Sequence, residues 1–183
     1  MMMQLDRNIQ EVLVSEEQLK KRIAEMAADI TRDYAGKAPL MVGILRGSVL
    51  FMADLVRQID LPISMDFMVV SSYGAGTVSS GLVNIKKDLE EDIRGRDVII
   101  VEDILDTGNT LVKLTAELLR REPASLKLCV MLDKPSRRTT PIKADYVGFS
   151  IPDAYVVGFG LDYDQVYRQL PYVGVLKPEI YEK

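Results

Sequence analysis

Short apolar runs that alternate with helical stretches constrain the fold of this chain more than any other feature of its sequence. Each run has the composition of a buried strand. The four runs span Leu40 to Leu45, Ile63 to Ser71, Asp97 to Glu102 and Leu126 to Leu132. Continuously apolar strands that alternate with helices are typical of a parallel sheet covered by helices on both faces. The pattern therefore predicts an α/β fold.

The stretches between these runs carry the start and stop signals of helices. Ser15 and Gln18 form a capping-box pattern, the apolar positions that follow share one face, and Gly36 ends the stretch. We expect helices over Ser15 to Tyr34, from the turn at Arg46-Gly47-Ser48 through Ile59, and from about Thr110 to Arg121.

The remaining segments predict one domain with two mobile or peripheral parts. Ser71 to Gly81 is small, polar and rich in glycine, which indicates a flexible loop, and we expect a lid over about 71–86. Short strand-like pieces in the last third, about 145–183, are expected to form a small hood that helps to close a site. The 183 residues suffice for one core and are too few for two comfortable ones, so 1–183 is expected to be a single domain.

Composition excludes several classes of function. The chain has no histidine, so it has no Ser-His-Asp triad and no histidine-ligated zinc, and proton transfer falls to carboxylates, lysine, tyrosine or the substrate. Its single cysteine, Cys129, lies in an apolar run and is expected to be a buried strand residue rather than a nucleophile. The net charge of −4 argues against a broad surface for nucleic acid.

The chain also lacks the sequence signals of membrane insertion and export. No apolar run approaches the about 18 residues that a membrane-spanning helix needs. The first residues lack the basic-then-apolar layout of a signal peptide. We therefore expect a cytoplasmic protein without membrane partners.

The segment from Val98 to Leu111 is the most informative about chemistry. Its apolar strand ends in Glu102 and Asp103, which can serve one ligand together only where the chain already turns. Two neighbouring acceptors suit the vicinal hydroxyls of a ribose. The next turn, Asp106 to Thr110, is made of small residues and runs into a helix, so its backbone N–H groups suit a phosphate. The alternative is that Glu102 and Asp103 only cap the sheet edge and that an ordinary turn follows. That alternative leaves unexplained why both features occur together in one segment.

This segment resembles the phosphoribosyl-pyrophosphate-binding motif of type I phosphoribosyltransferases. The chain as a whole resembles their hypoxanthine (hypoxanthine-guanine) branch, the bacterial form in particular, from the first helix to Val173-Gly-Val-Leu. The resemblance implies a parallel sheet flanked by helices with a small hood subdomain. It also implies that Glu102 and Asp103 hold the ribose hydroxyls, directly or through Mg²⁺, and that Asp106 is the catalytic carboxylate that exchanges a proton with purine N7. The 5′-phosphate would be bound by Asp106, Thr107, Gly108, Asn109 and Thr110.

The resemblance extends to a pyrophosphate loop and a lid. Leu45, Arg46 and Gly47 match the family's pyrophosphate loop, in which the peptide bond before the basic residue can be cis, and the alternative is a plain strand-to-helix turn. Ser72 and Tyr73 open the expected lid, which in the family closes over the site and excludes water. A surface hairpin without a catalytic role is the alternative for this segment.

The base would be recognised by residues from the second half of the chain. By the resemblance, Lys134 donates to O6 and so selects 6-oxopurines, Tyr155 stacks on the purine, and Val156 presents its backbone to the base edge. Spacing from Lys134 favours Arg138 for a phosphate-side role, while Arg137 is interpreted as part of a solvated turn. Asp162 would join Glu102 and Asp103 in holding the metal, and Arg168 would reach the pyrophosphate.

The predicted reaction transfers phosphoribosyl from phosphoribosyl pyrophosphate to N9 of hypoxanthine or guanine, with Mg²⁺ as cofactor. We favour hypoxanthine between the two bases and expect a homo-oligomer. The nearest alternative is a phosphoribosyltransferase for xanthine or uracil, and a second is a regulator of the same fold that binds nucleic acid. A dinucleotide-dependent oxidoreductase is disfavoured because no G-x-G-x-x-G follows a strand.

Overall fold

The computed structural model describes residues 4–71 and 84–182 of the chain. In chain order the helices and strands are η1 (Gln4–Asn8), β1 (Ile9–Val14), α1 (Glu16–Asp33), β2 (Leu40–Leu45), α2 (Val49–Val56), β3 (Ser64–Ser71), β4 (Asn84–Lys87), β5 (Asp97–Leu105), α3 (Asn109–Leu119), β6 (Ser125–Asp133), η2 (Pro135–Arg137), β7 (Tyr146–Ser150), β8 (Val156–Val157), β9 (Val173–Leu176) and α4 (Pro178–Tyr181). Ser72 and Tyr73, and with them most of the expected lid at 71–86, lie outside the described residues.

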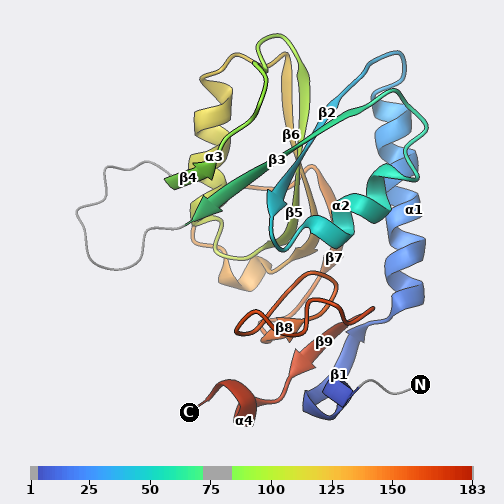
Figure 1. Cartoon of the computed structure of the whole chain (residues 1–183), viewed down its shortest axis with the longest axis vertical. Coiled ribbons are helices and arrows are strands. Elements are labelled where there is room, and N and C mark those ends of the chain that lie inside the picture. The colour runs from blue at the N-terminus through green and yellow to red at the C-terminus, as the bar shows by residue number, and fades with distance from the viewer. Residues whose placement is uncertain (1–3, 72–83, 183) are drawn as a thin grey trace.

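The large sheet contains the four predicted apolar runs as its central strands. Within the described residues its order is β4-β3-β2-β5-β6-β7 (Figure 1). The strands from β3 to β7 in this order are parallel, and β4 pairs antiparallel with β3 at one edge. The predicted α/β fold with a mainly parallel sheet is therefore confirmed.

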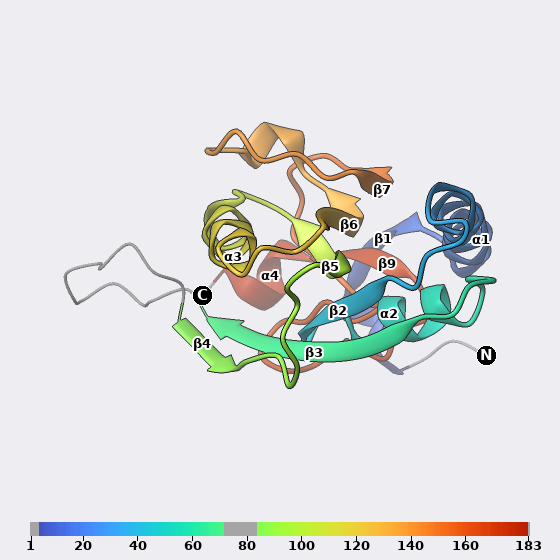
Figure 2. The same cartoon turned by 90° about the horizontal axis from the view of Figure 1, so that it is seen from above.

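Helices cover both faces of this sheet, which explains why its strands are apolar on both sides. Figure 2 shows α1 and α2 on one side of the sheet and α3 on the other. On the first side, Ile99 and Cys129 pack against α1 and α2. On the second, Ile100 and Val130 pack with the buried leucines of α3. Cys129 lies in β6 and is fully buried, so the expectation of a buried strand residue is confirmed, and burial raises the pKa of its thiol.

The helix boundaries follow the local sequence signals closely. Ser15 caps α1: its hydroxyl accepts from Gln18 N–H at 3.3 Å, and the Gln18 side chain accepts from Ser15 N–H at 2.8 Å. The second helix, α2, ends at Val56, three residues earlier than the expected Ile59, because Gln58 N–H and Ile59 N–H donate to carbonyls only three residues back.

None of the described helices is long and apolar enough to cross a membrane.

A second, small sheet forms the hood below the large one (Figure 1). Its order is β1-β9-β8, and both pairings are antiparallel. Two features differ from the sequence expectation for 145–183. β7 pairs with β6 and so belongs to the large sheet, and β1 from the N-terminal part pairs with β9. Pairing between distant segments leaves no local sequence signal, which is why β1 was not assigned to the hood.

Candidate active site

Two adjoining cavities lie where the parallel strands end. In open α/β sheets this carboxyl edge is the usual place for ligands. The first, here called the loop cavity, has a volume of about 330 Å³ and the second, the hood cavity, about 430 Å³. They share Ile104 and Asp106. The loop cavity is also lined by Ile44, Leu45, Gly47, Val70, Ser71, Glu102, Asp103, Thr107, Gly108, Asn109, Thr110 and Leu111. The hood cavity is also lined by Lys134, Arg137, Asp153, Ala154, Tyr155, Val156, Leu161, Asp162 and Tyr181.

The two carboxylates at the end of β5 both line the loop cavity, although neighbours in a regular strand face opposite sides. Among the described residues, buried Glu102 Oε2 accepts no hydrogen bond. Burial raises the pKa of Glu102 well above its usual value, and the nearby Asp103 raises it further. Burial also raises the pKa of Asp103 to about 6, against the opposing effects of the Ile104 N–H and Arg168. Asp103 accepts from the Ile104 N–H at 2.7 Å, whereas Glu102 Oε2 has no partner among the described residues, so the pair fits a ligand that brings a further donor or cation.

A glycine makes room for the Asp103 carboxylate. A Cβ at Gly47 would lie 1.6 Å from Asp103 Oδ2, so a side chain here is incompatible with the observed geometry. The peptide bond between Leu45 and Arg46 is cis, a geometry that the sequence left open. The end of β2 and the end of β5 thus meet in direct contact at the loop cavity.

The turn from Asp106 to Asn109 is held in place from behind. Gly108 has a φ of +84°, and a Cβ there would lie 2.3 Å from Thr140 Oγ1. The carbonyl of Thr107 accepts from Thr139 N–H at 3.1 Å and from the Thr140 hydroxyl at 3.2 Å. The N–H groups in the first turn of α3 have no intrahelical acceptors, so they can donate to an anion in the loop cavity, and of these Asn109 N–H also contacts Thr107 Oγ1 at 3.4 Å.

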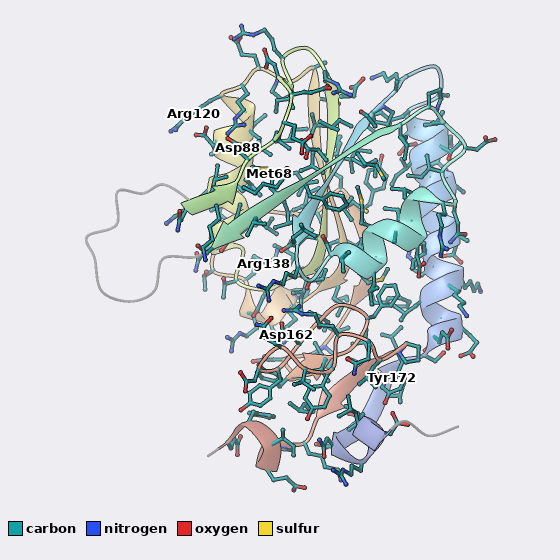
Figure 3. The ribbon with its side chains drawn as sticks, viewed as in Figure 1. Met68, Asp88, Arg120, Arg138, Asp162 and Tyr172 are labelled. Carbon is teal, nitrogen blue, oxygen red and sulfur yellow. The ribbon has the colours of Figure 1, made fainter. Side chains whose placement is uncertain are left out.

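Arg138 completes this support rather than facing a cavity. Its guanidinium donates to the carbonyls of Asp106 at 2.9 Å, Ile142 at 2.8 Å and Leu105 at 3.1 Å, and it pairs with the Asp133 carboxylate. Figure 3 shows Arg138 above Asp162, where the large sheet meets the hood. Arg138 is not among the described residues that line either cavity. This position favours support of the turn over the phosphate-side contact expected from its spacing.

Lys134 and two residues of the hood form the other wall of the site. Lys134 follows β6 and is 7% exposed, and its ammonium donates to the Ala154 carbonyl at 2.6 Å. Tyr155 lines the same cavity and is 41% exposed as a residue, and Val156 is buried beside it. The structure therefore brings Lys134, Tyr155 and Val156 together with Asp106, as the sequence analysis expected.

Arg46 and Arg168 are linked by a residue that the sequence analysis did not single out. Gln165 accepts from Arg46 Nη1 at 2.6 Å and from Arg168 Nη2 at 3.4 Å. Arg168 also pairs with Asp162 at 2.7 Å. Asp162 lines the hood cavity, whereas Glu102 and Asp103 line the loop cavity. Within 4–71 and 84–182, no three carboxylates lie close enough to hold a metal ion by themselves.

Arg137, interpreted from the sequence as a solvated residue, lines the hood cavity. Its Nε lies 3.4 Å from Asp106 Oδ1, and its Nη1 lies 3.7 Å from Asp153 Oδ2. Asp106 Oδ1 is buried and accepts no hydrogen bond from the described residues. Two adjacent arginines in one short turn give no local signal of which one faces a site, so the sequence could not have identified it.

Comparison with known proteins adds independent findings. A family model for the phosphoribosyl transferase domain matches residues 10–164. The chain is 54% identical over 177 residues to the hypoxanthine-guanine phosphoribosyltransferase of Streptococcus pneumoniae, with 97% of this chain and 98% of that protein covered. It is 52% identical over 178 residues to the protein of the same name from Bacillus subtilis, with 97% and 99% covered. The crystal structure of a hypoxanthine phosphoribosyltransferase from Staphylococcus aureus superposes with a TM-score of 0.95 at 50% identity over 100% of both chains.

Proposed function

The chain belongs to the phosphoribosyl transferase domain family, and we propose that it is a hypoxanthine-guanine phosphoribosyltransferase of purine salvage. It transfers the phosphoribosyl group of phosphoribosyl pyrophosphate to N9 of hypoxanthine or guanine and releases pyrophosphate. One observation carries the proposal: two cavities of different chemistry meet at Asp106. The loop cavity offers carboxylates and helix amides for a sugar phosphate, and the hood cavity offers an aromatic ring and a buried lysine for a base.

The donor's ribose phosphate belongs in the loop cavity. Glu102 and Asp103 would accept hydrogen bonds from the 2′ and 3′ hydroxyls, which would give the orphaned Glu102 oxygen a donor. The 5′-phosphate would be bound by the N–H groups of the turn from Asp106 to Thr110 at the start of α3. The supports behind the turn keep its carbonyls away from this anion.

The pyrophosphate would lie near the end of β2. Leu45, Arg46 and Gly47 line or border the loop cavity, and Arg168 is tied to Arg46 through Gln165. Ser72 and Tyr73 are proposed to contact the same group.

The donor set fits Mg²⁺. The orphaned oxygen of Glu102 and the raised pKa of Asp103 suit a divalent cation, and Mg²⁺ is usually bound by few carboxylates and mostly by substrate oxygens. Glu102 and Asp103 would hold the ion on one side, and Asp162 would join them by releasing Arg168. When bound, the ion neutralises charge on the leaving pyrophosphate.

The base would be held in the hood cavity, with the purine plane against Tyr155. Lys134 would donate to O6, and a 6-amino group would place two donors against each other, so adenine is rejected. As the C1′–O bond breaks, its electron pair leaves with the pyrophosphate, and the N9 lone pair forms the new bond to C1′. The proton on N7 then passes to the carboxylate of Asp106. Arg137 lies beside that carboxylate and would stabilise its charge before the base arrives.

We also propose that the enzyme acts in the cytoplasm as a homo-oligomer of a single-domain chain. Its exposed apolar residues include Val49 on α2 and Met65 on β3, which are 41% and 54% exposed. Cell fractionation tests the cytoplasmic location, light scattering tests the homo-oligomer, and a single unfolding transition in urea tests the single domain.

A spectrophotometric assay with phosphoribosyl pyrophosphate and Mg²⁺ tests the function. Hypoxanthine, guanine, xanthine, adenine and uracil are compared, and we expect turnover of hypoxanthine and guanine, with hypoxanthine the better substrate. A folded protein that binds the donor and turns over none of these bases would refute the proposal. A salt-dependent gel shift with RNA or DNA would then support the regulator of the same fold.

A further inference from the structure

The ring on which the base is proposed to stack has few supports of its own. Tyr155 lies in the loop between β7 and β8, and the residue is 41% exposed. An exposed ring with free rotation about χ1 loses that freedom when a ligand stacks on it, which weakens binding. A stacking residue is therefore effective only if something fixes the plane of its ring beforehand.

The C-terminal segment fixes Tyr155 at two points. Leu176 N–H donates to the backbone carbonyl of Tyr155 at 2.8 Å. Tyr181 stacks on the Tyr155 ring, with centroids 4.7 Å apart and planes 19° apart. Tyr163 touches the same ring edge-on, at 5.7 Å and 84°. One segment thus holds both the backbone and the ring of the residue that receives the base.

Tyr181 is itself held by the hood. The short helix α4 follows β9 directly, and Lys177 N–H donates to the Asn8 carbonyl at 3.0 Å. Ile180 and Tyr181 pack against a buried cluster that includes Val157 and Leu176. Tyr181 also lines the hood cavity, so its ring lies at the site and not on a remote surface.

We propose that Tyr181 is a positioning residue for the base: it stacks on one face of Tyr155 and leaves the other face to the purine. The bound state is then a stack of three rings, purine on Tyr155 on Tyr181. This inference rests on the proposed function, because it takes the hood cavity as the base site. It assigns a part in base binding to the last helix of the chain, outside the residues matched by the family model.

Steady-state kinetics of three variants tests the proposal. Tyr181→Ala removes the ring, Tyr181→Leu keeps apolar bulk without a flat surface, and Tyr181→Phe keeps the stack. An aromatic pair contributes enough to raise the KM for hypoxanthine by about two- to tenfold when it is lost. We expect that increase in the alanine and leucine variants, an unchanged KM for phosphoribosyl pyrophosphate, and rescue of the hypoxanthine KM by phenylalanine. A lower hypoxanthine KM in Tyr181→Ala would show that the ring occupies the place of the base, and equal KM values in all variants would show that it has no role.

Near-UV circular dichroism tests the ring contact without any substrate. The chain has eight tyrosines and no tryptophan, so the signal reports on tyrosine packing. Tyr181→Ala should change the spectrum strongly in the native background and weakly in a Tyr155→Ala background, because the coupled pair is already broken there. An equal change in both backgrounds would overturn the inference. A wild-type protein that turns over no purine would instead refute the proposed function while this spectral result stands.

Discussion

Replacing Arg138 by methionine tests whether this residue supports the phosphate-binding turn from behind. Methionine keeps most of the apolar length of the side chain and removes every hydrogen bond of the guanidinium. The carbonyls of Asp106 and Ile142 lose a charged donor, and the Asp133 carboxylate loses its partner. Leu105 keeps a second donor, the N–H of Lys134, at 3.0 Å.

The expected loss follows from these contacts. A hydrogen bond to a charged group contributes about 1.5 kcal/mol or more, so two orphaned carbonyls correspond to a loss of about 3 kcal/mol in the free energy of unfolding. For a chain of this length, that lowers the melting temperature by about 10 °C. Release of the Asp106 carbonyl also loosens the turn, so the KM for phosphoribosyl pyrophosphate should rise by about tenfold while the KM for hypoxanthine changes less.

Arg137 provides a matched control in the same turn. Its side chain is 49% exposed, and its ion pairs are 3.4 and 3.7 Å long, so Arg137→Met should cost less than about 1 kcal/mol. Urea unfolding at fixed protein concentration and donor-dependent kinetics are measured for both variants. If the two lose the same stability, or if Arg138→Met leaves the donor KM unchanged, the supporting role of Arg138 is refuted.

Three further changes test other parts of the site and its surroundings. Lys134→Met should lower kcat/KM for hypoxanthine by about 10²-fold or more, because O6 of the base loses its buried hydrogen-bond donor. The KM for phosphoribosyl pyrophosphate should change little. Gly108→Ala forces an alanine into a φ of +84°, at a strain of about 1–2 kcal/mol, and places its Cβ 2.3 Å from Thr140 Oγ1. Calorimetry should therefore show weaker binding of phosphoribosyl pyrophosphate, and an unchanged affinity would contradict the role of the turn. Although burial opposes the charged form of Asp66, the Glu90 N–H and the Lys87 ammonium lower its pKa below the usual 3.8. The stability that the charged carboxylate contributes is therefore present above pH 4 and lost as pH falls through the lowered pKa, so Asp66→Asn should destabilise the protein at pH 7 in urea titrations and have a shrinking effect as the pH is lowered below 4.

The strands and helices of the large sheet could be predicted because their signals are local. Continuous apolar runs mark β2 and β6, and a capping box marks the start of α1. The end of β5 was placed too early, at Glu102, because the adjacent carboxylates of Glu102 and Asp103 were interpreted as the start of a turn. They remain in the ladder through Leu105 since β6 pairs with them as far as Asp133.

Site residues could be predicted where residue type and position in the sequence indicate the chemistry. They could not be predicted where the local course of the backbone determines which side chain faces the site. Asp106 and Lys134 come directly after the ends of two parallel strands and Glu102 lies near the end of one of them, so their convergence follows from the fold. The contrasting positions of Arg137 and Arg138 depend on the course of η2, which the sequence of two adjacent basic residues does not reveal. The position of Tyr181 at the site depends on contacts between distant segments, among them the pairing of β9 with β8.

The most direct test of the account is the rate of Asp106→Asn with saturating phosphoribosyl pyrophosphate, Mg²⁺ and hypoxanthine. Asparagine keeps the size of the side chain but cannot accept the N7 proton, so kcat should fall by about 10²- to 10⁴-fold while calorimetry still detects binding of the donor. A variant that keeps the wild-type kcat would contradict the claim that the Asp106 carboxylate, where the two cavities meet, accepts the N7 proton.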